Sequence, residues 1–390
     1  MPMAQWAARD DLPALVAALG ADDCRFVGGC VRDALLGIEA ADVDIATRHV
    51  PERTQELLKQ AGIRSVPTGI EHGTITAILP HGPVEITTLR KDVDTDGRRA
   101  TVAFASEWFD DAARRDFTIN ALYAHPEHFR ISDYFGGLAD LDARIVRFIG
   151  DAETRIREDH LRILRYFRFQ ARFGSDVDEK AEAACRDLAS TLKGLSRERV
   201  AMELLSILAL PDPASSVERM AELGVLQVIL PEVDDEGIAA LAALQHAEKR
   251  GDIAADPVRR LAALLPPDAE IARQVASRLR LSNAQKKRIA LAAARDAHDA
   301  QNPRSLAYRL GVEAAVDRLL LLGESTAPVT GWDVPQLPVS GGDIVAAGIG
   351  KGPLVARTLH AVEGRWIAEG FPDAERTRAI LVEEVGKARM

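Results

Sequence analysis

Two aspartates, Asp42 and Asp44, stand one residue apart in a stretch that is typical of a β-strand. Residues i and i+2 of a strand point to the same side of a sheet, so the two carboxylates should lie together. Like charges repel and burial is costly for each of them, which disfavours such a pair unless cations neutralise it. Two divalent ions would relieve that cost and could stabilise the attacking and leaving oxygens of a phosphoryl displacement. Oxygen ligands combined with nucleotide phosphates favour Mg²⁺.

A glycine turn precedes this aspartate pair. Gly28 and Gly29 follow a strand-like run and open a short helix that we expect to end at Gly37. Without side chains, the two glycines would let backbone N–H groups approach a triphosphate, and Arg32 would add positive charge. The turn therefore predicts a phosphate-binding element next to the metal-binding carboxylates.

A third carboxylate, Glu85, alternates with apolar residues in a second strand-like run. An acid at such a position needs a partner. Glu85 either completes the metal shell or pairs with an arginine such as Arg90.

The next dense cluster of polar residues spans positions 114–122. Arg114, Arg115, Asp116 and Asn120 interleave there with apolar residues, as if reaching from a packed element into a cleft. Taken alone, the cluster is equally compatible with a network of surface ion pairs.

A run of arginines follows in residues 158–169. On a continuous helix, Asp159 and Arg162 would be neighbours one turn apart, and Arg165 and Arg168 would continue at the same spacing. Arginine donates to base edges and phosphates, and aspartate accepts from an exocyclic amino group, which cytosine and adenine both carry. Asp159 and Arg162 could thus select CTP or ATP, and reject UTP and GTP, without a nucleic-acid template.

The elements that position these side chains change type along the chain. Most glycine turns and alternating apolar runs lie in residues 1–143, which indicates an α/β arrangement. Ala, Leu, Arg and Glu dominate from Asp151 onward and indicate helices.

The composition limits the possible functions. The chain has 390 residues, of which 47% are hydrophobic and 28% charged, and this mix excludes a disordered chain. A formal net charge of −10 argues against a protein that coats nucleic acid over its whole surface, although a local basic cleft remains compatible with it. Three cysteines without metal-ligand spacing fit a reducing cytoplasm, where we expect the protein. We expect no membrane span, no signal peptide and no obligate protein partner.

Five motifs occur in a fixed order: GGCVRDALLG with DVDIAT, VEITTLR, RRDFTINAL, DYFGGLADL and EDHLRILRYFRF. This order resembles the class II tRNA nucleotidyltransferase and bacterial poly(A) polymerase family of the DNA polymerase β superfamily. The resemblance implies an α+β fold with a catalytic head that contains a five-stranded sheet (residues 1–143). All-α domains would follow it: a nucleotide-recognising neck (144–210), a body (211–330) and a tRNA-binding tail (331–390).

The resemblance also implies roles for individual residues. Asp42 and Asp44 would bind two Mg²⁺ ions, and a flexible loop would run from Leu89 to Arg99. A hinge between head and neck would involve Asp133, Gly136, Gly137 and Asp140, and Glu203 would belong to a weaker motif with a structural role. The predicted site comprises the carboxylates Asp42, Asp44 and Glu85 and the nucleotide-binding residues Gly28, Gly29, Arg32, Arg115, Asp116, Asn120, Asp159, Arg162, Arg165 and Arg168.

The implied reaction is nucleotidyl transfer from CTP and ATP to a tRNA 3′ end, which builds the sequence CCA. A poly(A) polymerase shares the head and neck motifs, and a partial enzyme would add only CC or only A. A catalytically inactive tRNA-binding relative is a further alternative, against which the intact Asp42–Asp44 pair argues. The C-terminal part lacks a strongly basic extension, and residues 339–353 resemble the tail of CCA-adding enzymes, so both features favour tRNA.

Overall fold

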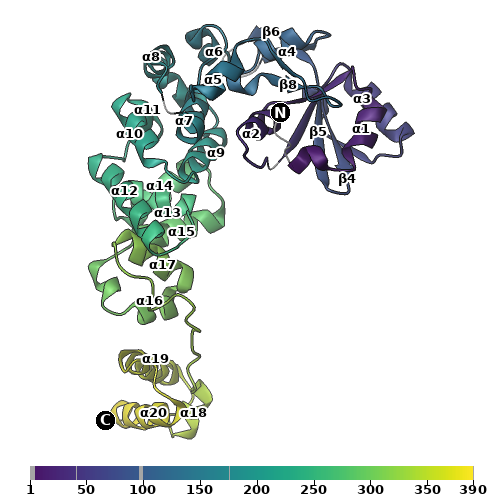
Figure 1. The fold of residues 1–390 in the computed structure, drawn as a ribbon. Helices are drawn as coiled ribbons and strands as arrows, with labels where there is room; N and C mark the ends of the chain where they lie inside the picture. The colour runs from purple at the N-terminus through teal and green to yellow at the C-terminus, as the bar shows by residue number, and fades with distance from the viewer. Residues whose placement is uncertain (1–4, 41, 96–99, 175, 390) are drawn as a thin grey trace. The chain divides into compact units, whose positions relative to one another are not determined.

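The computed structural model describes residues 5–40, 42–95, 100–174 and 176–389. It divides into two compact units, Met1–Pro231 and Glu232–Met390. Figure 1 shows the strands in the first unit and an all-helical second unit. Arg98 and Arg99, at the end of the predicted loop, lie outside the described residues. The finer division into head, neck, body and tail stays a prediction.

The first unit alternates strands with short helices before it becomes helical. Its strands are β1 (Cys24–Val27), β2 (Val43–Thr47), β3 (Ser65–Gly69), β4 (Thr74–Leu79), β5 (Gly82–Thr88), β6 (Arg90–Thr95), β7 (Ala100–Phe104), β8 (Leu122–Ala124) and β9 (Ile131–Asp133). Its α-helices are α1 (Leu12–Leu19), α2 (Gly29–Leu35), α3 (Pro51–Gln60), α4 (Trp108–Ala113), α5 (Gly137–Asp142), α6 (Ala152–Glu158), α7 (Arg162–Phe173), α8 (Glu179–Asp187), α9 (Arg197–Leu208), α10 (Ala214–Glu222) and α11 (Val225–Ile229). Its 3₁₀ helices are η1 (Gln5–Ala8), η2 (Ile70–His72), η3 (Thr118–Asn120) and η4 (Ala189–Gly194).

The main sheet confirms the α+β class, but it has seven strands where the resemblance implied five. Their order is β3-β4-β5-β2-β1-β8-β9, and only the β2–β5 pair is parallel among these neighbours. The two edge strands are β3, whose middle residues are exposed, and the three-residue β9. Edge strands pair on one side only and carry a weak apolar pattern, so they are easily missed in a sequence. β6, which lies within the predicted loop, and β7, which follows that loop, form a separate two-stranded sheet.

The face of the sheet that carries the chemistry is packed under α4. Val27 of β1 and Ala46 of β2 belong to one buried cluster with Trp108 of α4 and Tyr123 of β8. Because neighbouring strand residues alternate between faces, Asp44 shares the face of Ala46. Helix α3 packs against strand β4 of the sheet and against helix α1 (Figure 1).

An aromatic cluster fixes α7 against the strand-containing part of the first unit. Phe117 packs against Phe148 and against Phe169 of α7, with ring centroids 4.8 and 5.2 Å apart. Tyr166 of α7 stacks on Phe148 from the same helix face. Each aromatic ring buries a large apolar area, so these contacts anchor α7 beside the sheet.

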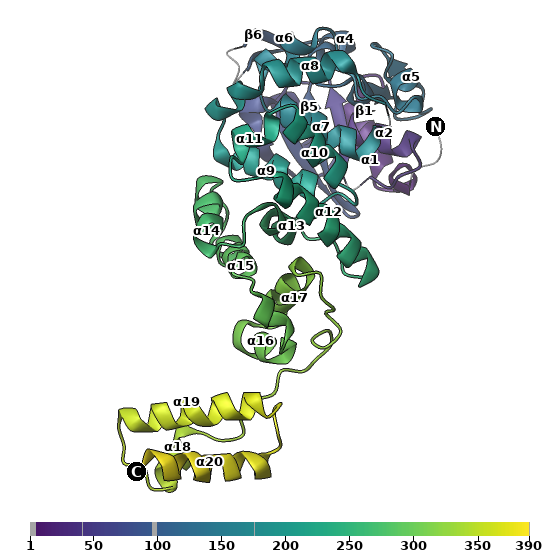
Figure 2. The ribbon, with the colours of Figure 1, turned by 90° about the vertical axis from the view of Figure 1, so that its left-hand side faces the viewer.

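The second unit contains only helices among the residues described. They are α12 (Asp235–Arg250), α13 (Pro257–Leu264), α14 (Ala269–Arg278), α15 (Asn283–Ala293), η5 (Ala297–Ala300), α16 (Pro303–Leu310), α17 (Val312–Leu321), α18 (Gly341–Ala346), α19 (Pro353–Ala368) and α20 (Ala374–Ala388). Figure 2 shows α19 and α20 side by side, and the Tyr308 hydroxyl of α16 donates to Glu363 of α19. No described helix combines the length and apolarity needed to span a bilayer.

Gly137→Ala should lower the free energy of unfolding by about 1–3 kcal/mol, the usual cost of overpacking. A Cβ at this position would lie 2.3 Å from the Thr118 carbonyl oxygen, which is backbone and cannot swing away. Urea denaturation followed by circular dichroism measures the effect. Gly69→Ala is the matched control, because its Cβ would meet Thr74 at an ordinary 3.5 Å. Equal losses in the two variants would contradict the argument.

Candidate active site

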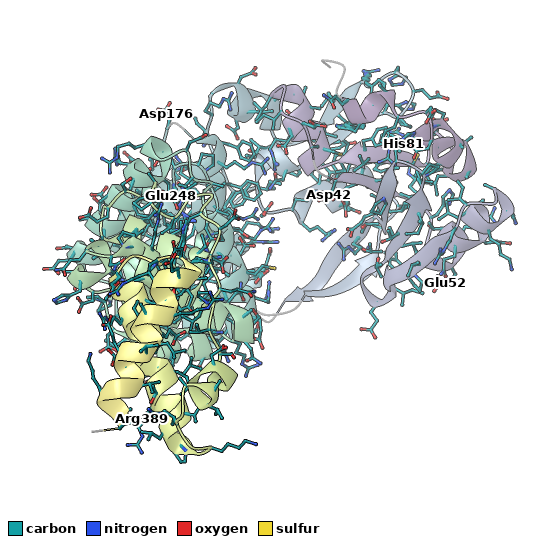
Figure 3. The ribbon with its side chains drawn as sticks, turned by 90° about the horizontal axis from the view of Figure 1, so that it is seen from below. Asp42, Glu52, His81, Asp176, Glu248 and Arg389 are labelled. Carbon is teal, nitrogen blue, oxygen red and sulfur yellow. The ribbon has the colours of Figure 1, made fainter. Side chains whose placement is uncertain are left out.

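The structure brings the three predicted carboxylates together. Asp44 of β2 and Glu85 of β5 are partners in the parallel ladder, and Asp42 is an exposed residue directly before β2 (Figure 3). Burial raises the pKa of Asp44 to about 6, with contributions from the negative charges of Glu85 and Asp42 and an opposing one from Arg115. The cluster therefore holds negative charge that is not fully balanced by protein.

These residues fit a hard divalent cation by the chemistry of their donors. Carboxylate oxygens are ligands that Mg²⁺ prefers. Within the described part of the chain, no three His, Cys, Asp or Glu side chains form a ready-made metal cage. Mg²⁺ commonly binds through one or two carboxylates plus substrate phosphates, so an incomplete protein shell suits an ion that arrives with a nucleotide.

The glycine turn lies against Arg115. The sequence analysis assigned both to the nucleotide-binding site. Gly28 has φ +70°, a left-handed conformation that favours glycine, and a Cβ there would lie 3.3 Å from Arg115 Nη1. The Gly28 N–H donates to the Leu122 carbonyl at 3.2 Å, so this group is already used. Any backbone contact to phosphate from this turn must therefore come from Gly29 and the residues after it.

A buried aspartate that the sequence analysis missed, Asp111, holds Arg115 in place. Its carboxylate accepts from Arg115 Nη2 at 3.0 Å, from Arg114 Nε at 2.9 Å and from the Tyr123 hydroxyl at 2.8 Å. Burial alone would raise the pKa of Asp111, but the two guanidinium charges hold it well below its ordinary value. The available signal was its position three and four residues before the two arginines, the spacing of helical neighbours.

Four predicted residues form one chain of hydrogen bonds from α2 to α7. Arg32 Nη1 donates to Asn120 Oδ1 at 2.5 Å, and Asn120 Nδ2 donates to Asp116 Oδ1 at 3.0 Å. Arg165 Nε of α7 then donates to Asp116 Oδ2 at 2.8 Å. Burial would raise the pKa of Asp116, but the charge of Arg165 and the hydrogen bonds from Asn120 and Arg165 lower it to about 2. The cluster at 114–122 is therefore a buried connection and not a surface network.

The expectation that Asp159 and Arg162 share one continuous helix is wrong. α6 ends at Glu158 and α7 begins at Arg162, so Asp159 lies in the break between them. The Asp159 carboxylate accepts from the backbone N–H of Leu161 at 3.2 Å, a local bond that competes with helical hydrogen bonding. Its other oxygen accepts from Arg199 Nη2 of α9 at 2.7 Å.

The arginines of the predicted ribbon are held by acids and carbonyl groups. Arg162 Nη1 donates to Glu158 at 2.6 Å, and its Nη2 donates to the Arg114 carbonyl at 2.9 Å. Arg168 Nε donates to Glu203 of α9 at 2.7 Å. Glu203 is buried, and its structural role stays a prediction.

Two family models match parts of the chain. The poly A polymerase head domain matches residues 24–147, and the probable RNA and SrmB-binding site of polymerase A matches residues 174–236. A relative over most of the length is the mitochondrial CCA tRNA nucleotidyltransferase 1 of Mus musculus. It is 36% identical over 372 residues, which cover 90% of this chain and 84% of the relative.

Solved structures share the fold. The Bacillus stearothermophilus CCA-adding enzyme in complex with CTP is 25% identical with a TM-score of 0.74, covering 97% of this chain and 98% of that chain. The Thermotoga maritima CCA-adding enzyme complexed with tRNA is 23% identical with a TM-score of 0.71, covering 97% and 95%. At 23% identity, the likeness to the Thermotoga maritima structure shows the fold alone.

Asp116→Asn should cost about 2 kcal/mol of unfolding free energy at pH 7, since a pKa of about 2 lies below the ordinary 3.8. The ionised carboxylate stabilises the fold above about pH 4, and this contribution disappears as the pH falls through about 2. The difference from the native chain should therefore shrink between pH 4 and pH 2 in urea denaturation. Asp187→Asn, at a carboxylate that is 57% exposed, is the control. A difference that stays constant with pH would refute this account.

Proposed function

The chain belongs to the family of class II CCA-adding enzymes and is a nucleotidyltransferase, and from that premise we propose that it adds C, C and A to the 3′ end of tRNA. CTP and ATP are the proposed substrates, and no nucleic-acid template takes part. The relative from Mus musculus, aligned over most of both chains, supports tRNA as the acceptor. The Bacillus stearothermophilus complex supports CTP as a ligand of this fold.

One observation carries the proposal most directly. Asp44 and Glu85 are adjacent in the ladder with Asp42 beside them, and the glycine turn and Arg115 border the same face. Acids that crowd together next to a guanidinium suit a site where phosphate and a divalent cation meet.

The proposed reaction is attack of the terminal ribose hydroxyl of the tRNA on the α-phosphate of the nucleotide, with pyrophosphate leaving. Two bound Mg²⁺ ions would lower the pKa of that hydroxyl and neutralise the leaving phosphates. Asp42 and Asp44 would hold the ions, and Glu85 adds a carboxylate beside Asp44. Arg115, kept rigid by Asp111, would bind the phosphates without reorganising during the reaction.

Base selection is assigned to the break between α6 and α7. The Asp159 carboxylate would accept from the exocyclic amino group of cytosine or adenine, and Arg162 would donate to acceptors on the base edge. Arg162 is anchored by Glu158 and by two backbone carbonyl groups, so its remaining donors have a fixed direction. A rigid pair of this kind could read the base as a template strand would.

The larger assignments follow from the same premise. We assign catalysis to residues 1–143, nucleotide recognition to 144–210, and tRNA binding to the tail at 331–390, with the body at 211–330 between them. The cytoplasm is the proposed compartment, although the relative from Mus musculus is mitochondrial.

The alternative activities differ in substrate rather than in chemistry. A poly(A) polymerase would extend unstructured RNA with ATP, and a partial enzyme would add only CC or only A. A non-catalytic relative would bind tRNA without incorporating nucleotide. CCA addition is preferred because the relative from Mus musculus, matched over 84% of its length, carries that name. The presence of Asp42, Asp44 and Glu85 argues against a non-catalytic relative.

The purified protein should add C, C and A to tRNA that lacks these residues, when CTP and ATP are offered together with Mg²⁺. Asp44→Ala should abolish incorporation while leaving circular dichroism and tRNA binding largely unchanged, because only the metal-binding acid is lost. Each nucleotide is offered singly and mixed, on tRNA and on an unstructured RNA, and products are separated by length. Equal extension of both RNAs with ATP would point to a poly(A) polymerase. Normal turnover by Asp44→Ala would remove the two-metal mechanism.

Asp159→Ala should relax base choice more than it affects metal binding. A bidentate base contact is worth ~1–3 kcal/mol, so discrimination against UTP and GTP should fall roughly ten- to hundredfold. Single-nucleotide addition with all four nucleotides, on tRNA ending before C, after C and after CC, measures the change. Arg168→Ala serves for comparison and should slow all nucleotides alike. If Asp159→Ala keeps the full preference at every stage, selection lies elsewhere.

A further inference from the structure

The Asp33 carboxylate of α2 is not among the predicted site residues. It lies between two arginines from different parts of the chain. Its Oδ1 accepts from Arg32 Nε at 2.8 Å, and its Oδ2 accepts from Arg172 Nη2 of α7 at 3.1 Å. The side chains of Arg32 and Asp33 are 5% and 7% exposed, whereas that of Arg172 is 36% exposed. Asp33 thus joins the helix that follows the glycine turn to the C-terminal end of α7.

The contact continues through aromatic rings of α7. The Arg32 guanidinium lies 4.3 Å from the ring centroid of Phe173 and 5.2 Å from that of Phe169. Arg172 lies 4.7 Å from the centroid of Phe173, so the two guanidiniums share one ring. Cations over aromatic faces are held in orientation as well as in place.

We propose that Asp33 is a positioning residue that holds the phosphate-binding Arg32 and the glycine turn against the C-terminal end of α7, and so, through the length of this helix, at a set distance from the base-reading residues at its N-terminal start. This inference rests on the proposed function and adds to it a device that sets the span between triphosphate and base. The span matters because one nucleotide must contact both ends of the site at once, and a shift of about 1 Å at either end can cost a large part of the rate.

Charge explains why Asp33 cannot be replaced by a neutral group. Two guanidiniums that share Phe173 repel each other, and the carboxylate between them removes that repulsion. In Asp33→Asn the two cations remain but the anion is gone. The amide oxygen can accept from only one of the two guanidiniums, so the other meets the Nδ2 donor and the two cations face each other unscreened. Removing the second cation as well, in Asp33→Asn with Arg172→Gln, should relieve part of that defect.

The test measures kcat and KM for CTP and ATP, on tRNA lacking CCA, together with thermal unfolding. Asp33→Asn should raise KM for both nucleotides roughly tenfold or more, the usual size of a lost charge-assisted hydrogen bond, and leave KM for tRNA unchanged. Arg172→Gln, at a side chain more exposed than Asp33, should give a smaller rise in the same direction. The double variant should fall between the two single variants.

The matched control is the pair formed by Glu182 of α8 and Arg219 of α10. It has the same pattern of a buried acid, 5% exposed, with a 44% exposed arginine, but it joins two helices that hold none of the proposed site residues. Arg219→Gln should leave KM for both nucleotides unchanged.

A fall in thermal stability and kcat with KM unchanged in Asp33→Asn and Arg172→Gln would show a merely structural brace and overturn the proposal. A double variant no better than Asp33→Asn would also overturn it. If the native protein adds no nucleotide to tRNA, the proposed function itself fails, and the two failures are thereby distinguished.

Discussion

The ion pair between Asp116 and Arg165 is the contact on which the candidate site depends. A carboxylate this deeply buried is stable only with a charged partner, and its partner comes from α7, 49 residues further along the chain. Through Asn120 the same carboxylate also holds Arg32, so the glycine turn and α7 share one hydrogen-bonded connection. The packing of Phe117 on Phe169 adds apolar surroundings on the side of Asp116, where the low local dielectric strengthens its electrostatic interactions.

Two groups of acids can be distinguished in and around the candidate site, and the difference between them bears on their proposed roles. Asp111, Asp116 and Glu203 are buried and each is ion-paired with arginine, so their charge is already used by the fold. In the part of the chain that the structure describes, Asp42, Asp44 and Glu85 have no ion-pair partner. Acids that lie next to one another, with the Arg115 charge only partly opposing theirs, are destabilising on their own. A bound cation would offset that cost, and this is the physical reason for which we propose Asp42, Asp44 and Glu85 as the metal-binding acids.

Much of this site could be predicted from the sequence, because its chemistry is concentrated in short motifs. The spacing of Asp42 and Asp44 predicted their common face. This stays a prediction because Asp42 lies before β2, although its negative charge contributes to the raised pKa of Asp44. The register that sets Glu85 opposite Asp44 could not be predicted, since parallel pairing joins strands 41 residues apart with no local signal. The break in the helix at Asp159 was not predicted, because the residue pattern around it fits one continuous helix. The hydrogen bond from the Leu161 N–H to the Asp159 side chain determines the local structure instead. The partner of a buried acid such as Asp116, which is Arg165 at a separation of 49 residues, is likewise set by tertiary packing and has no local signal in the sequence.

Selecting a base without a template strand requires side chains that cannot adapt to the wrong base. Flexible arginines would bind any nucleotide, because their five donors can rotate to meet different acceptors. Arg162 is restrained by the carbonyl groups of Arg155 and Arg114 and by the Glu158 carboxylate, and Asp159 is restrained by Arg199. These restraints are formed by the protein before any nucleotide arrives, so the ordering cost of recognition is met during folding and not during binding. The charged contacts around α7 therefore do more than stabilise the unit, because they limit the directions in which its donors and acceptors can point. In the proposed function, specificity for the base would arise from that limit.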